Sequence, residues 1–386
     1  MRVNRSLIWL ALGLGCLSCV EPFEPELREV QDLMVISGVI TDRAGEHTVE
    51  ISRSSPYNTP AFQPVTGCVV AVEDERGEIH SYEEQEPGIY RTDLPASFLA
   101  VGKSYALRVL APDGTSYRSD YDTLLACPPV DSVYYEVMRQ PTNDPDRTLY
   151  GLQFYSDLSG TKGMTGNFRW VLEETWEYKS AYTSTYIWQG EELPELLYAD
   201  TVSTCYMTGR IPSVFTATTR SLSGNGIRRN PLNYVSNETP RLHVRYSLLV
   251  EQQSLTNGAF GYWDRLKALS QETGGLYETQ PPVVTGNVFN TEDPEERVLG
   301  YFYATQPRQK RIFVGSGFEF TTPAFACKLD TFYILGDIVE IYTRYPIYLF
   351  SLDPEGPFPP YLTSSYSCFD CRLLGGSNKK PAFWEP

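Results

Sequence analysis

Residues 33–42, Leu-Met-Val-Ile-Ser-Gly-Val-Ile-Thr-Asp, decide the fold class of this chain. The run is rich in β-branched side chains and alternates apolar with small or polar positions, which is the period of a half-buried β-strand. It ends at Thr41-Asp42, and Arg43-Ala44-Gly45-Glu46 follows as a turn signal. The sequence therefore begins its folded part with a strand.

Similar short runs follow at close spacing, at residues 47–51, 69–73, 79–82 and 105–109. Turn signals separate them, at residues 74–77 and 112–114. Closely spaced strands with no helix between them indicate an antiparallel β-sandwich of the immunoglobulin or transthyretin type. We place this domain at residues 30–127, because Pro128 and Pro129 interrupt any regular element there.

The remaining residues, 128–386, predict a second, larger β-rich domain. Strand-like runs recur at residues 132–137, 151–155, 168–173, 242–248, 311–314 and 338–342, and the polar segment 175–240 predicts long loops or a hairpin. A single amphipathic helix is predicted where Tyr262, Leu266 and Leu269 share one face and Thr273-Gly274-Gly275 ends it. We expect Trp263 on this helix to pack into the core.

The N-terminus has the layout of a secretory signal peptide, residues 1–18. A basic start is followed by an apolar run from Leu7 to Leu17, well short of the about 20 residues that span a bilayer. Cys16-Leu17-Ser18-Cys19 resembles a bacterial lipobox, so we expect cleavage before Cys19 and acylation of that cysteine. Cys16 is the alternative, since Leu14-Gly15 precedes it. Residues 19–29 are acidic and carry prolines, which predicts a tether between the membrane lipid and the first domain.

The charge of the chain argues against nucleic acid as a partner. Removal of residues 1–18 takes away Arg2 and Arg5 and leaves 30 basic against 48 acidic residues, a formal net charge of −18. No basic stripe interrupts this acidic composition, and phosphate backbones bind to basic surfaces. The expected contact with a membrane is therefore the lipid on Cys19.

Six further cysteines are candidates for disulfides in an exported protein: Cys68, Cys127, Cys205, Cys327, Cys368 and Cys371. Six cysteines allow 15 pairings. We expect Cys68 to pair with Cys127, because both lie in the first domain. Cys368-Phe369-Asp370-Cys371 lacks a following helix, which a redox C-x-x-C motif needs, so structural disulfides are the better interpretation.

No motif for catalysis, metal binding or a cofactor is present in the sequence. It contains no G-x-S-x-G, H-E-x-x-H or phosphate-binding loop, and its histidines, His47, His80 and His243, are isolated. Adjacent acids such as Glu173-Glu174 read as solvated surface in a chain this acidic. We therefore expect a protein that is not an enzyme and has no cofactor or metal.

Two resemblances refine this interpretation. The order of "VISGVITD", "PVTGCVVAVEDERGEIHSY", "EPGIYRT" and "VGKSYALRVLAPDGTSYRS" resembles transthyretin-like or carboxypeptidase-regulatory-like sandwiches over roughly residues 30–125. "CVEPFEP", "YWDRLKALSQETGGLYETQPPVVTGNVFNTEDPEERVLGYFYAT" and the terminal "CFDCRLLGGSNKKPAFW" resemble the domain of unknown function 4249 family of Bacteroidota outer-membrane lipoproteins.

The second resemblance implies an outer-membrane lipoprotein anchored through Cys19. It implies a frequent neighbour, a TonB-dependent outer-membrane receptor, and the acidic stretch Glu21, Glu24 and Glu26 is similar to signals for export to the cell surface. The expected function is an accessory or ligand-binding partner of such a transporter. The alternative is a surface adhesin that binds glycans or proteins without a transporter.

The C-terminal end predicts a tail fixed to the domain. Gly375-Gly376 permits a bend, Lys379 and Lys380 are expected to be exposed, and Phe383 and Trp384 can bury their rings. A partner-docking role for Trp384 is the alternative.

Overall fold

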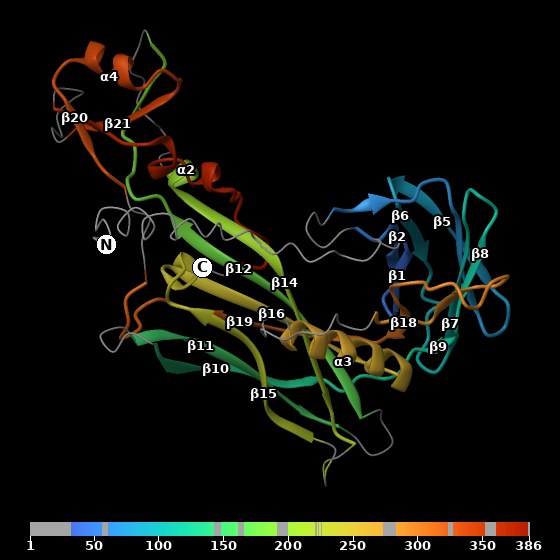
Figure 1. Ribbon diagram of the computed structural model, residues 1–386. Coiled ribbons are helices and arrows are strands. Elements are labelled where there is room, and N and C mark those ends of the chain that lie inside the picture. The colour runs from blue at the N-terminus through green and yellow to red at the C-terminus, as the bar shows by residue number, and fades with distance from the viewer. Residues whose placement is uncertain are drawn as a thin grey trace, which may run out of the picture.

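The computed structural model describes most of the chain after the predicted tether. The described residues are 32–55, 61–142, 148–160, 166–190, 200–220, 222, 224, 226–272, 283–322, 327–351 and 360–384. The predicted signal peptide, the tether, Cys16 and Cys19 lie outside them. The described part is mainly β, as expected, and consists of three modules (Figure 1). We call them the N-terminal, central and C-terminal modules.

The N-terminal module is one long sheet that curls over on itself. Its strands are β1 (Met34–Thr41), β2 (Gly45–Arg53), β3 (Gln63–Pro64), β4 (Val69–Asp74), β5 (Ile79–Glu86), β6 (Ile89–Leu94), β7 (Ser104–Leu110), β8 (Ser116–Ser119), β9 (Asp122–Thr123), β17 (Val288–Asn290) and β18 (Phe302–Thr305). The order along the sheet is β17-β8-β7-β4-β5-β6-β2-β1-β18, with β3 beside β2 and β9 beside β7. The five strands predicted for residues 33–109 are all present.

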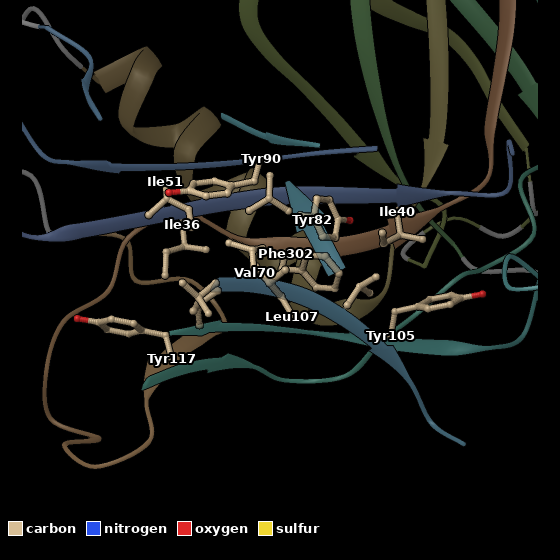
Figure 2. Close-up of a cluster of buried hydrophobic side chains, with 14 of the residues drawn as sticks. Ile36, Ile40, Ile51, Val70, Tyr82, Tyr90, Tyr105, Leu107, Tyr117 and Phe302 are labelled. Carbon is tan, nitrogen blue, oxygen red and sulfur yellow. The ribbon is translucent and has the colours of Figure 1, made fainter. Parts of the chain in front are cut away.

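The core of this module lies between the two halves of the curled sheet. Ile36 and Ile51 on one half face Val70 and Leu107 on the other, and each is fully buried (Figure 2). Burial of a branched aliphatic side chain contributes about 1.5–3 kcal/mol, so the inward positions of these alternating strands hold the module together. The resemblance of residues 30–125 to transthyretin-like sandwiches stays a prediction.

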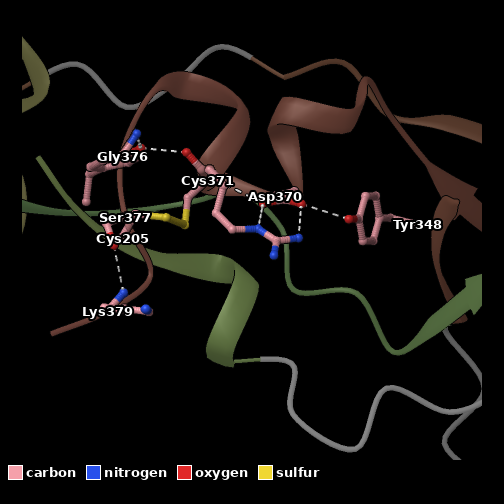
Figure 3. The surroundings of a disulfide bond; sticks show 9 residues. Cys205, Tyr348, Asp370, Cys371, Gly376, Ser377 and Lys379 are labelled. Carbon is pink, nitrogen blue, oxygen red and sulfur yellow. Dashed lines mark hydrogen bonds and ion pairs between the residues drawn. A yellow bond between two sulfur atoms is a disulfide. The ribbon is translucent and has the colours of Figure 1, made fainter.

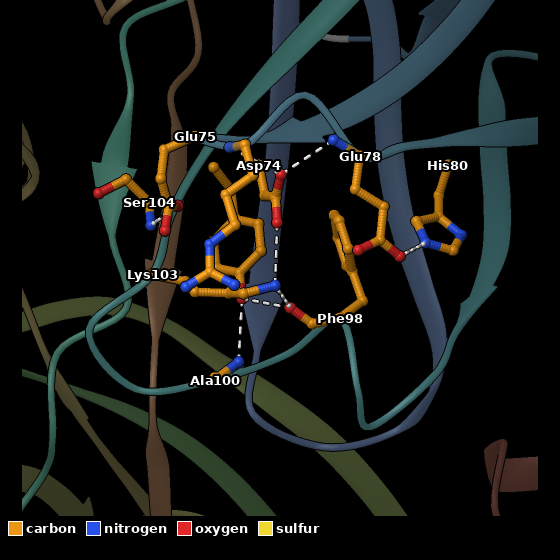
Figure 4. A network of polar contacts seen from close by, with 10 residues as sticks. Asp74, Glu75, Glu78, His80, Phe98, Ala100, Lys103 and Ser104 are labelled. Atoms are coloured by element: carbon orange, nitrogen blue, oxygen red, sulfur yellow. Dashed lines mark hydrogen bonds and ion pairs between the residues drawn. The ribbon is translucent and has the colours of Figure 1, made fainter.

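A buried ion pair fixes the turn between β4 and β5, which the sequence predicted at residues 74–77. Asp74 is fully buried, and its carboxylate accepts from Lys103 Nζ at 2.9 Å and from the backbone N–H groups of Arg76 and Glu78 (Figure 4). Although burial opposes ionisation, these donors hold the pKa of Asp74 below its usual value. Lys103 also lies over the Phe98 ring, so the turn is joined to the core.

A segment from the C-terminal half of the chain completes the N-terminal module, so this module extends beyond the residues 30–127 expected for it. β18 pairs in parallel with β1, and β17 pairs with β8. Phe302 is buried in the same core as Ile36. The side chain of Asn287 joins the two returning strands, since it donates to the Phe302 carbonyl and accepts from the Phe302 N–H. The module is therefore not purely antiparallel and not contiguous in sequence.

The central module consists of two sheets packed face to face. The first has β10 (Val130–Pro141), β11 (Thr148–Ser159) and β15 (Gly226–Ser236), and the second has β12 (Asn167–Lys179), β14 (Thr204–Thr218), β16 (Arg245–Ser254) and β19 (Pro307–Val314). Phe154 from the first sheet and Trp170 and Tyr246 from the second are buried between them. The predicted hairpin in segment 175–240 is present, because β12 pairs with β14.

In the described part of the chain α3 is the long helix, and the other helices are short. Helix α3 (Asn257–Glu272) confirms the predicted amphipathic helix, and α2 (Asp200–Ser203) and the 3-10 helix η1 (Pro240–Leu242) are brief. No helix among the described residues is long and apolar enough to cross a membrane.

The C-terminal module is small. It contains β13 (Tyr186–Trp188), β20 (Asp330–Phe332), β21 (Ile347–Ser351), β22 (Tyr361–Thr363), α4 (Leu335–Ile341), η2 (Tyr366–Cys368) and η3 (Cys371–Leu374). The strand expected at residues 338–342 is wrong, because this run forms the end of α4. Ile338 packs against the sheet with Leu335, Val339 and Tyr342, which is helical spacing. Packing of this face overrides the strand preference of the β-branched residues.

Two disulfides involve the C-x-x-C cysteines, and neither joins them to each other. Cys205 on β14 pairs with Cys371 (Figure 3), and Cys327 pairs with Cys368. Structural disulfides, expected from the sequence, are therefore present. The first joins the central module to the C-terminal module. Tyr178 supports it by donating to the Cys371 carbonyl at 2.5 Å.

The pairing expected between Cys68 and Cys127 is wrong, because both are free, buried thiols. Cys68 lies beside Tyr90 in the N-terminal core, whereas the Cys127 thiol contacts Gln252 of the central module. The two cysteines thus belong to different packing environments. Burial raises the pKa of both thiols, that of Cys127 to about 11, so both stay protonated at neutral pH.

The tail after Gly376 is fixed, as predicted. Trp384 is buried, its indole contacts Tyr206 and Phe313, and its Nε1 donates to Glu177 at 3.3 Å. Phe383 lies under the guanidinium of Arg311 at 3.5 Å. Lys379 and Lys380 are exposed, as expected. The ring of Trp384 is occupied by this packing, which removes it as a docking residue for a partner.

Candidate ligand-binding cleft

An open cleft of about 610 Å³ lies between the N-terminal module and the central module. Strands β1, β2, β5, β6 and β18 of the N-terminal module line it together with β12, β14 and helix α3. Figure 1 shows α3 between the long strands of the central module and the N-terminal module. A concave site between two modules is where ligand pockets preferentially occur.

A second cavity of about the same volume lies between β14, β15 and α3. Its lining consists of strand and helix residues, several of them apolar, such as Pro212, Val214 and Leu232. Its charged residue, Lys267, donates to the Thr216 carbonyl. The inter-module cleft combines aromatic rings with charged groups of both signs. It is therefore the stronger candidate for a ligand site.

Four aromatic residues form a continuous wall in the cleft. Tyr262 stacks on Tyr301 with 4.8 Å between ring centroids, and its edge meets Trp263 at 5.2 Å. Trp263 in turn meets Tyr303 at 6.0 Å. Burial raises the pKa of the tyrosine hydroxyls of Tyr262, Tyr301 and Tyr303, so these groups remain neutral donors at physiological pH.

Arg169 on β12 is the central polar group of this wall. Its guanidinium lies 3.4 Å from the centroid of the Trp263 ring, and its Nη1 donates to the Tyr303 hydroxyl at 2.8 Å. Tyr303 donates onward to Gln253 at 3.1 Å. Among the described residues no carboxylate pairs with Arg169. The guanidinium is thus positioned by an aromatic ring and a phenol. Its positive charge has no carboxylate partner within the described residues.

The opposite wall is acidic. Glu46 and Glu50 on β2 and Glu86 on β5 line it, together with Arg91 on β6. Arg91 makes ion pairs with Glu46 at 3.6 Å and with Glu86 at 3.2 Å. A shallow groove of about 370 Å³ continues the cleft along this wall and shares Glu46 and Arg91 with it. The cleft therefore has one cationic, aromatic side and one acidic side.

The sequence around β18 explains why aromatic rings gather here. In Tyr301-Phe302-Tyr303 the side chain of Phe302 points into the N-terminal core, while the two tyrosines point to α3. The strand is therefore buried on both faces. Trp263 packs against this cluster, as predicted, and it also lines the cleft. The aromatic run Tyr301-Phe302-Tyr303 indicates a strand that is buried on both faces. It does not indicate which strands pair with it.

A hydrogen-bonded junction holds the two walls together. The Ser254 hydroxyl donates to the Leu125 carbonyl at 2.6 Å, and the Thr305 hydroxyl donates to the Ser254 carbonyl at 2.8 Å. The amide of Gln252 donates to the Pro128 carbonyl at 2.8 Å. These bonds join the linker between the modules to β16 and β18, and they fix the spacing of the cleft.

Asp122 is a buried carboxylic acid at the same junction. Its Oδ1 accepts from the hydroxyl of Thr256, which precedes α3, and its Oδ2 accepts from the Ala304 N–H at 2.8 Å. Thr256 also accepts from the Ala259 N–H and so caps the helix. Burial, with no cationic partner among the described residues, raises the pKa of Asp122 to about 6.

We expect Asp122 to make stability depend on pH. In the folded protein the pKa of Asp122 exceeds the ordinary value of 3.8. The protonated side chain therefore contributes fully to the free energy of unfolding below pH 3.8, and this contribution is lost as pH rises through 6. Asp122→Asn removes this titration. The free energy of unfolding of the wild type relative to the variant should therefore be about 2 kcal/mol higher, meaning more stable, at pH 4.5 than at pH 7.5. Urea unfolding of both proteins at the two pH values measures this; a difference that does not change with pH would contradict it.

The other residues singled out in the sequence lie away from this cleft or serve structure. All six candidate cysteines are outside it. His47 lines it, but both ring nitrogens are engaged, with Thr41 and with the Gly45 carbonyl. His80 pairs with Glu78, and His243 contacts Thr322. No group of three or more potential metal ligands is found within the described ranges.

Comparison with known proteins adds one finding. A family described as "Domain of unknown function (DUF4249)" matches residues 20–311. The matched range contains the N-terminal module, both walls of the cleft and nearly all of the central module. It ends before the terminal stretch 368–384, whose likeness to the family stays a prediction. Among curated proteins, none matches this chain.

Proposed function

Because the chain belongs to the family described as Domain of unknown function (DUF4249), we propose that it is a lipid-anchored outer-membrane protein that binds a ligand for a TonB-dependent transporter. It acts without catalysis, at the cell surface. The observation that carries this proposal is the cleft between the N-terminal and central modules. Its rigid aromatic wall and charged groups of both signs suit binding of a polar ligand.

The sequence before the first described strand supports the location. Cys19 and the acidic tether precede β1, which begins at Met34, so the anchor would connect directly to the module that forms one wall of the cleft. A tether of this composition would keep the cleft near the membrane surface. This arrangement suits a protein that passes a ligand to a receptor in the same membrane.

The proposed partnership predicts that a TonB-dependent receptor co-purifies with the native protein. The test is purification from detergent-solubilised outer membranes, with quantitative mass spectrometry of the accompanying chains. A second outer-membrane lipoprotein purified in the same way serves as the control. We expect a receptor chain to be enriched with this protein and not with the control. Recovery of the lipoprotein alone would count against the transporter role.

One surface favours the second candidate function, an adhesin. On the C-terminal module, Tyr333, Ile334, Ile341 and Tyr345 are exposed, the first by 70%. Exposed tyrosines and aliphatic residues in a group are typical of surfaces that bind proteins or glycans. Recovery without a receptor, together with retention on a glycan array that is lost on replacing Tyr333 and Tyr345, would favour this function.

A further inference from the structure

We propose that the ligand of the inter-module cleft is an acidic sugar, whose carboxylate binds Arg169 and whose hydroxyls face the glutamates of β2. This inference rests on the proposed ligand-binding function and specifies the chemical class of the ligand. It follows from three features of the cleft: a guanidinium without a carboxylate partner, an aromatic wall, and carboxylates that line the other side.

Arg169 is prepared to bind a carboxylate. The guanidinium packs on the Trp263 ring, and its Nη1 donates to the Tyr303 hydroxyl. These contacts fix the side chain before a ligand binds, so binding costs little conformational entropy. Within the described residues, Nη2 of Arg169 has no hydrogen-bond acceptor. A planar guanidinium matches a planar carboxylate, and such charge-assisted hydrogen bonds are about twice as strong as neutral ones.

Arg210 supplies a second positive charge to the same wall. It lies on β14 directly across from Glu173 on β12, yet Glu173 is paired with Arg311 at 3.2 Å. Arg210 therefore has no ion-pair partner in the part of the chain that the structure describes, and it is exposed in the cleft. Two arginines without acids on one wall, in a chain with a formal net charge of −16, indicate a local preference for an anion.

The acidic wall favours hydroxyl groups over a second charge. Arg91 already neutralises Glu46 and Glu86 in part, but each carboxylate oxygen retains lone pairs that accept from hydroxyls. Since Arg91 pairs with Glu46 and Glu86, the wall offers an ammonium group at most one glutamate without an ion pair in the described residues, Glu50. A ligand with several hydroxyls on one edge and a carboxylate on the other matches both walls.

The aromatic wall favours a ring between them. Trp263 is the partly exposed ring of this wall, since Tyr262, Tyr301 and Tyr303 are buried, and sugar rings bind to aromatic faces through their C–H groups. The cleft volume of about 610 Å³ is within the range for ligands of a few rings. A short acidic oligosaccharide is thus the occupant that uses all three features.

The test is calorimetric titration of the full-length mature protein in detergent with trigalacturonate and with its fully methyl-esterified form. The ester keeps the rings and hydroxyls and lacks the charge. We expect saturable binding of the acid and at least about tenfold weaker binding of the ester, since the ester loses the charge-assisted hydrogen bonds to Arg169. Equal affinities, or no saturable binding of the acid at millimolar concentration, would overturn the inference.

Variants identify the site of binding. Arg169→Gln should weaken binding of the acid by about tenfold or more and leave that of the ester nearly unchanged, whereas Arg169→Lys should retain part of it. Arg210→Gln, at an exposed position, provides the same test without altering packing. The matched control is Arg118→Gln, since Arg118 also lies over an aromatic ring, that of Tyr121, but outside the cleft. Unchanged binding in both cleft variants would overturn the assignment.

Three further outcomes separate this inference from the proposed function. If a zwitterionic tripeptide binds and trigalacturonate does not, the sugar class is wrong, and ligand binding in the cleft stands. If a receptor co-purifies but trigalacturonate does not bind, the transporter role stands without the acidic sugar. If trigalacturonate binds and no receptor co-purifies, the ligand class stands and the transporter role fails.

Discussion

Gly286→Ala is expected to detach residues 284–306, the segment that returns to the N-terminal module, and to lower the free energy of unfolding by at least about 3 kcal/mol. A Cβ at residue 286 would overlap the carbonyl oxygen of Gly300, and a Cβ at Gly300 would overlap that of Ile36. The obstacles are backbone atoms, which cannot move aside as a side chain can. Gly300 also has φ +87°, a conformation that other residues rarely adopt. Gly286 therefore permits the close approach between the two strands of this segment, and Gly300 permits the close approach between the segment and β1.

Hydrogen exchange followed by mass spectrometry measures this effect where it should occur. The N–H groups of Ile36 and Gly38 donate to the carbonyls of Leu299 and Tyr301, so peptides over β1 report on the returning segment. We expect exchange there to be faster by roughly a hundredfold in the variant. Gly209→Ala is the matched control, because a Cβ at that position meets nothing within 4 Å. Wild-type protection in Gly286→Ala would show that the segment does not complete the module.

Local pattern was sufficient to predict most of the individual strands. β1, β2, β4, β5 and β7 were predicted because their alternation matches burial on one face, as in Met34, Ile36 and Ile40. The failure at 338–342 has a physical cause, since a short run of β-branched residues satisfies both periods. Only the packing of Ile338 and Leu335 against the C-terminal sheet decides for a helix.

Long-range pairing could not be predicted in the same way. The return of β17 and β18 to the N-terminal module depends on parallel pairing of Gly38 with Phe302, which no local pattern records. The disulfides pose the same problem, because Cys205 and Cys371 are separated by 166 residues and only the fold selects that pairing among 15. The cleft combines both difficulties. Arg169 on a strand and Trp263 on a helix meet only after three segments have assembled.

Cys19→Ala is expected to have the largest effect on where the protein is found. If the acyl chains on Cys19 are its attachment to the membrane, their loss leaves a chain with no other anchor proposed for it. Each buried methylene contributes about 0.8 kcal/mol, so several acyl chains provide stable attachment, and their removal should be nearly complete in effect. Ligand binding in the cleft should be unchanged, because the tether is separate from the cleft residues.

Cys16→Ala is the matched control for this experiment. Cys16 lies three residues before Cys19 in the same predicted signal, and it is the alternative site of cleavage and acylation. If Cys19 is the anchor, Cys16→Ala should leave attachment intact, since it removes a residue that is discarded with the signal peptide. Release by Cys16→Ala instead would move the anchor to that residue.

The most direct test of the account is therefore membrane fractionation of cells that express the wild type, Cys16→Ala and Cys19→Ala, followed by quantitative detection of the protein in each fraction. If the acyl chains on Cys19 attach the protein, we expect the wild type and Cys16→Ala to remain in the outer-membrane fraction and Cys19→Ala to move to the soluble fraction. Continued association of Cys19→Ala with the outer membrane would contradict it.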